Sequence, residues 1–90
     1  MYEYINHVLA NYLNTSVGYS EDEAIFILQR DLKNSPKFAE GVTEDLVKAF
    51  SDSDYSWKEV MAEYDVMYAD TEEEAHAYAK KILWSNLLGK

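Results

Sequence analysis

Apolar residues recur at the three- and four-residue spacing of an α-helix in five separate segments of the chain, and no segment alternates like a β-strand. In the first segment, between about residues 2 and 14, one helical face collects Ile5, Val8, Leu9, Tyr12 and Leu13. The other segments are separated by short runs of Ser, Asn, Asp, Gly or Pro. We therefore predict an all-α protein, a compact bundle of about five helices that forms a single domain over residues 1–90.

Three of the later helices are predicted to begin with a capping box. In this motif a Ser or Thr oxygen accepts from a backbone N–H three residues on, and a Glu at that position reaches back. The pairs are Ser20 with Glu23, Ser56 with Glu59, and Thr71 with Glu74. Between the second and third helices, Ser35-Pro36 ends one and starts the next, because proline restricts the residue before it and suits the first helical position.

The later helices also carry apolar faces that we expect to be buried. Gly41 lies inside the third helix and costs about 1 kcal/mol relative to Ala there, so we expect a kink or a late start. Gly89 is the expected end of the last helix. The predicted faces are Ala24, Ile25, Ile27, Leu28 and Leu32 widened by Phe26; Phe38, Val42, Leu46, Ala49 and Phe50; Trp57, Val60, Met61, Tyr64, Met67 and Tyr68; and Ala75, Tyr78, Ala79, Ile82, Leu83 and Leu87.

The charge balance is strongly acidic, with 17 Asp and Glu against 8 Lys and Arg and a net charge of −9. Such a field repels nucleic acid and anionic membranes and attracts basic proteins. The absence of cysteine excludes a disulfide scaffold, a thiolate zinc site and a cysteine nucleophile. We expect a cytoplasmic protein without a signal peptide or membrane span.

No pattern of residues indicates catalysis or a resident cofactor. Acidic runs at residues 21–23 and 72–74 lie in first helical turns, where the helix dipole already favours carboxylates. His7 and His76 each stand without a second ligand at helical spacing, so we expect both at the surface. No serine lies in a Gly-x-Ser-x-Gly elbow. The sequence therefore predicts a binding protein rather than an enzyme.

One segment partly matches a calcium-binding loop. Asp52, Asp54 and Ser56 fall at the first, third and fifth positions of such a loop, and Glu63 falls at the twelfth. Trp57 occupies the sixth position, where the loop needs glycine for a sharp turn. Because Ser56 also starts a predicted helix, we expect no calcium site and no other metal site.

Aromatic residues are abundant, with eight Tyr and two Trp. Tyrosine buries large area at low entropic cost and keeps a polar tip, which suits protein interfaces. Tyr19 and Tyr55 precede helices beside acidic residues, where each is equally well explained as a hydrophobic staple. As partner-binding residues we predict first Asp52, Asp54, Tyr55, Glu59 and Glu63, and second Tyr19, Glu21 and Asp22.

The order of several short motifs resembles the helical immunity proteins of contact-dependent growth inhibition systems. The motifs are Tyr12-Leu13-Asn14, Tyr19-Ser20-Glu21-Asp22-Glu23-Ala24, Asn34-Ser35-Pro36 and Thr43-Glu44-Asp45-Leu46, so the likeness covers about residues 8–50. The resemblance implies a cytoplasmic bacterial protein that binds a cognate toxin domain, commonly a nuclease, and blocks its active site. The alternative is a small accessory protein whose acidic face mimics nucleic acid and blocks another nucleic-acid-binding protein.

Overall fold

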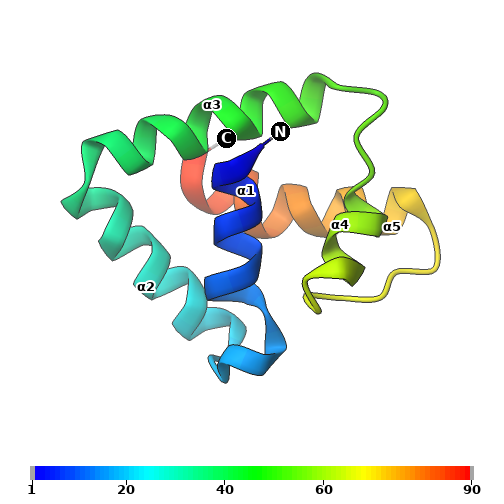
Figure 1. Cartoon of the computed structure of the whole chain (residues 1–90), viewed down its shortest axis with the longest axis horizontal. Helices are drawn as coiled ribbons and strands as arrows, with labels where there is room; N and C mark the ends of the chain where they lie inside the picture. Colours follow the sequence, from blue (N-terminus) through cyan, green and yellow to red (C-terminus); the bar gives the residue numbers. More distant parts are fainter. Residues whose placement is uncertain (1, 90) are drawn as a thin grey trace.

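The computed structural model describes residues 2–89 as helices joined by short connections (Figure 1). No strand occurs in that part of the chain, so the prediction of an all-α bundle of about five helices is confirmed. Two of the five continue in π-helical geometry, and one additional 3₁₀ turn follows the first helix. The elements are α1 (Glu3–Val8) continued by η1 (Leu9–Leu13), η2 (Thr15–Val17), α2 (Glu21–Asn34), α3 (Pro36–Ser51), α4 (Trp57–Glu63), and α5 (Glu72–Ala79) continued by η3 (Lys80–Leu88).

The first helix lies at the centre, with α2 on one side of it, the α4–α5 pair on the other, and α3 running across the top (Figure 1). Its apolar face, predicted from the spacing, is fully buried at Ile5, Val8 and Leu9. Every other helix contributes to the same core, because each carries an apolar face that must be removed from water. The largest fully buried side chains are Trp57, Ile5, Leu9, Leu28, Leu46, Met61, Leu83 and Val8.

The predicted helix starts are correct, but only one of the three capping boxes forms in both directions. At α2, the Glu23 amide donates to Ser20 Oγ (3.2 Å) and the Ser20 amide donates to Glu23 Oε1 (3.0 Å). At α4 and α5 the Ser and Thr oxygens accept as expected, whereas Glu59 and Glu74 do not reach back. At α4 a distant residue, Glu72 of α5, adds a different cap: it accepts from Ser56 Oγ (2.6 Å) and from the Lys58 amide (3.1 Å).

The expected kink at Gly41 is wrong, because α3 is one unbroken helix from Pro36 to Ser51. The glycine is instead a point of close approach between helices. The Tyr4 ring of the first helix lies directly against Gly41, and a Cβ atom there would overlap that ring. The helix therefore accepts the unfavourable propensity of glycine to let α1 pack closely on α3.

The fourth helix is shorter than predicted and ends at Glu63. Asp65 adopts a left-handed conformation (φ 54°), and the Val66 and Asp65 amides donate to the carbonyls of Met61 (2.8 Å) and Ala62 (3.2 Å). This is the Schellman pattern that terminates helices. The expected buried stripe therefore stops at Tyr64, while Met67 and Tyr68 lie in the following connection, and Tyr68 is 71% exposed.

Candidate partner-binding surface

The negative charge is concentrated in one part of the molecule. Residues 52–74, which we call the acidic end, contain nine of the seventeen carboxylates and a single basic residue, Lys58. This segment comprises α4, the first turn of α5 and the connections beside them, and Figure 1 shows these elements together on one side of the bundle. Its acidic residues are Asp52, Asp54, Glu59, Glu63, Asp65, Asp70, Glu72, Glu73 and Glu74.

Few of these carboxylates are neutralised within the protein. Among residues 2–89 no polar or charged side chain is fully buried, so the charge is carried at the surface. Within residues 2–89 the one ion pair joins Arg30 to Asp31 (3.3 Å) on α2, outside the acidic end. The acidic end therefore presents uncompensated negative potential to solvent.

The residues predicted first as partner-binding divide into two groups. Asp54, Glu59 and Glu63 are exposed, and the two glutamates lie one turn apart on α4. Asp52 is partly buried and holds the loop: it accepts from Tyr2 Oη (2.9 Å) and from the Asp54 amide (3.0 Å). The first group can reach a partner, whereas Asp52 contributes mainly by positioning the loop.

Tyr55, predicted as an aromatic anchor, is already engaged within the fold. Its ring makes edge-to-face contacts with Trp57 and Tyr2, with both centroid distances at 4.9 Å. Burial raises the pKa of its phenol above the ordinary value. The ring therefore fastens the loop before α4 to the core, and only part of it remains available to a partner.

The residues predicted second lie around the N-terminus of α2. Tyr19 is 42% exposed, and with Glu21 it lines a cavity of about 110 Å³ beside Val66 and Tyr78. Glu21 accepts a hydrogen bond from Tyr78 Oη (2.8 Å), which ties α2 to α5. Burial, followed by this hydrogen bond, raises the pKa of Tyr78. Asp22, the next residue of the same turn, is also exposed.

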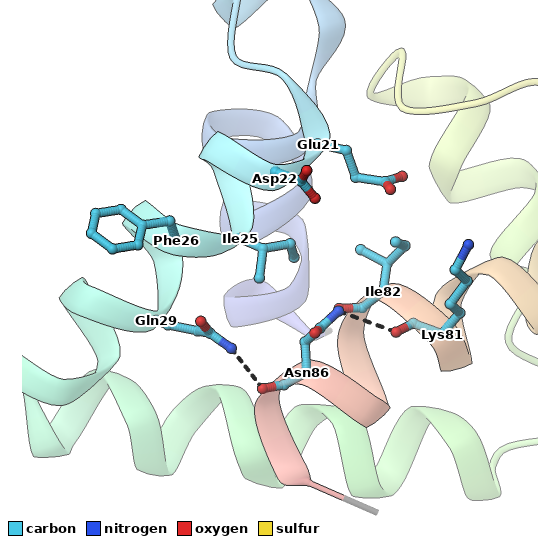
Figure 2. Close-up of a pocket in the computed structure, with 8 residues that line it drawn as sticks. All are labelled: Glu21, Asp22, Ile25, Phe26, Gln29, Lys81, Ile82 and Asn86. Carbon is cyan, nitrogen blue, oxygen red and sulfur yellow. Dashed lines mark hydrogen bonds between the residues drawn. The ribbon is translucent and has the colours of Figure 1, made fainter.

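A groove that the sequence did not reveal lies between α2 and η3, with a volume of about 250 Å³ (Figure 2). Glu21, Asp22 and Lys81 lie at one end of it, and Gln29 Nε2 donates to the Asn86 carbonyl (2.9 Å) at the other. We call this the α2–η3 groove. Its lining residues are Glu21, Asp22, Ile25, Phe26, Gln29, Lys81, Ile82 and Asn86.

Phe26, on the rim of this groove, does not lie where the sequence predicted. It was expected to widen the buried face of α2, but its side chain is 68% exposed and points away from the core (Figure 2). The sequence did carry a signal for this. Phe26 stands two residues from both Ala24 and Leu28, the buried positions of α2, and residues two apart on a helix do not share a face.

A second concave region, also unforeseen, lies between the first helix and the start of α3. The rings of His7 and Phe38 meet edge to face at 5.7 Å, and Tyr4 and Tyr12 lie on either side of Phe38. Cavities of about 300 and 340 Å³ open there. Both His7 and His76 are exposed, as predicted.

Residues 2–89 contain neither a cluster of metal-ligating side chains nor a helix able to span a membrane. No group of three or more His, Cys, Asp or Glu side chains is arranged to hold a metal ion. The segment resembling a calcium loop is helical from Trp57 onward, as the cap at Ser56 predicted. None of the helices in this described part of the chain combines the length and apolar character needed to cross a bilayer.

Comparison of the chain with protein-family models, with curated proteins and with solved structures finds no match.

Proposed function

We propose that this chain is a cytoplasmic immunity protein that binds a cognate toxin, a basic nuclease domain, and neutralises it by covering its active site. The observation that carries the proposal is the acidic end, where seven of the nine carboxylates are exposed and one lysine lies among them. The exposed acids of α4 and of the first turn of α5 suit the binding of a basic surface, because carboxylates at a protein surface attract cationic groups.

The physical basis is charge complementarity. A nuclease holds phosphates with Lys and Arg, so its active-site cleft is positively charged. An inhibitor with the opposite potential is steered to that cleft, and association rate constants reach about 10⁸ M⁻¹s⁻¹ at low salt. Rapid capture matters when a toxin must be stopped before it acts. A complex of standard size buries about 800 Å² on each partner, an area that the acidic end and its flanks are suited to supply.

The resemblance of residues 8–50 to immunity proteins supports the same proposal from a different part of the chain. The motifs of that segment form the end of the first helix, the start of α2, the junction of α2 and α3, and the middle of α3. The acidic end lies outside it. The two arguments therefore rest on separate residues, and an experiment on one does not presuppose the other.

The decisive experiment is co-expression of this chain with the product of the neighbouring gene. We expect that product to arrest growth when expressed alone, growth to recover when both are expressed, and the two proteins to co-purify at low salt. A neighbouring product that is harmless and is not bound overturns the proposal. A bound, harmless nucleic-acid-binding protein instead favours the alternative of an acidic nucleic-acid mimic.

A further inference from the structure

The α2–η3 groove combines features that the acidic end lacks. Its floor is apolar, formed by Ile25 and the buried Ile82, and the ring of Phe26 stands exposed at its edge (Figure 2). Exposed aromatic rings beside a groove are typical of the anchors that dominate interface energetics. At the acidic end the rings of Tyr55 and Trp57 pack inside the fold, and the exposed ring of Tyr68 donates its hydroxyl to Asp65.

The charged end of the groove specifies what kind of segment it accepts. Glu21 and Asp22 lie in the first turn of α2, both exposed, and neither forms an ion pair with Lys81 within the described residues. A cationic side chain of a partner gains attraction from both carboxylates. Lys81 stands on the same side as Glu21 and opposes that cation (Figure 2).

We propose that the α2–η3 groove docks a segment of a basic protein partner, in which an apolar side chain lies on Phe26 and Ile25 and a neighbouring Arg or Lys lies between Glu21 and Asp22. This rests on the proposed function, since the segment belongs to the same basic partner. The Glu21–Tyr78 hydrogen bond links this corner of α2 to α5, the helix whose first turn belongs to the acidic end.

The test uses a defined probe, the acetylated and amidated peptide Leu-Arg-Ala-Leu-Lys, titrated into the ¹⁵N-labelled protein. We expect the amide shifts of Ile25, Phe26, Ile82 and Asn86 to move. Phe26→Ser should weaken the affinity for the peptide about tenfold, which is the loss expected for an interface anchor. The matched control is Tyr68→Ser, which removes an equally exposed ring from outside the groove and should leave affinity unchanged.

A second variant changes a charge of the groove and leaves Phe26 in place, so it tests the proposal independently of that ring. Lys81→Glu removes the opposing cation and adds a carboxylate, so it should tighten peptide binding several-fold at low salt. Shifts confined to residues 52–74, or equal affinity of the Phe26→Ser and Tyr68→Ser variants, overturn the groove as the docking site. The proposed function would fail separately, through absence of protection from the toxin in co-expression.

Discussion

The carboxylate of Asp45, on α3, caps the N-terminus of α1: its Oδ2 accepts from the backbone amides of Tyr4 (2.9 Å) and Ile5 (3.3 Å). The residue at the local cap position, Tyr2, has a left-handed backbone (φ 56°) and provides no side-chain cap. Tyr2 instead donates its hydroxyl to Asp52. The start of the central helix is thus held by residues more than forty positions away.

Asp45→Ala should lower the free energy of unfolding by about 1–2 kcal/mol, because two helix N–H groups lose their acceptor. The neighbouring Glu44 is exposed, so Glu44→Ala is the control and should change stability by less than about 0.5 kcal/mol. Urea unfolding followed by circular dichroism measures both. Equal stabilities of the two variants would show that the inter-helix cap contributes nothing.

Gly41→Ala should destabilise the protein, although the same change in an ordinary helix interior stabilises by about 1 kcal/mol. The added methyl group meets the Tyr4 ring, and overpacking of this kind costs about 1–3 kcal/mol. In a Tyr4→Ala background the obstruction is gone, so Gly41→Ala should there become neutral or stabilising. The double-mutant cycle is read from urea unfolding, and additivity of the two changes would contradict the close approach.

The Tyr12–Asp31 hydrogen bond (2.6 Å) predicts a pH dependence. Burial, assisted by this bond, raises the pKa of Tyr12 from 10.0 to about 12. The unfolded chain therefore ionises first: the contribution of Tyr12 to stability is complete below pH 10 and is lost as pH rises through about 12. Tyr12→Phe should flatten the fall of the urea midpoint over that interval. An unchanged slope in the variant would assign the dependence to the other tyrosines, Tyr55 and Tyr78.

Helix starts were predictable from the sequence because they depend on side chains three residues from the atoms they bind. Ser20, Ser35, Ser56 and Thr71 all cap as expected. The end of α4 was not predictable in the same way. It depends on Asp65 taking a left-handed conformation, and the Asp65 carbonyl accepts from both the amide (3.1 Å) and the Oγ1 (3.0 Å) of Thr15, fifty positions earlier.

The same difference between local and long-range contacts applies to the candidate surface. The exposure of Glu59 and Glu63 follows from local helix periodicity, and Asp54 lies in the polar loop before α4, so these positions were found from the sequence. The engagement of Tyr55 with Tyr2 and the α2–η3 groove both require contacts between distant segments. Gln29 and Asn86, which close the groove, are 57 positions apart, and no local pattern pairs them.

Reversing charge at the acidic end should slow capture of a basic partner while leaving the fold intact. The variant is Asp54→Lys, Glu59→Lys and Glu63→Lys together; Asp52 is retained because it accepts from Tyr2 and the Asp54 amide. All three positions are exposed. The association rate with the co-purified toxin should fall on the order of tenfold or more at low ionic strength and recover toward the unchanged protein at high salt.

The matched control carries the same change in net charge elsewhere, as Glu3→Lys, Glu40→Lys and Glu44→Lys, which are exposed on α1 and α3. Stopped-flow association at two salt concentrations compares the pair, and circular dichroism checks that both remain helical. If steering depends on where the charge lies, the association rate should fall strongly only for the variant at the acidic end. An equal fall in the association rate of both variants would mean that net charge alone acts, and it would contradict the acidic end as the interface.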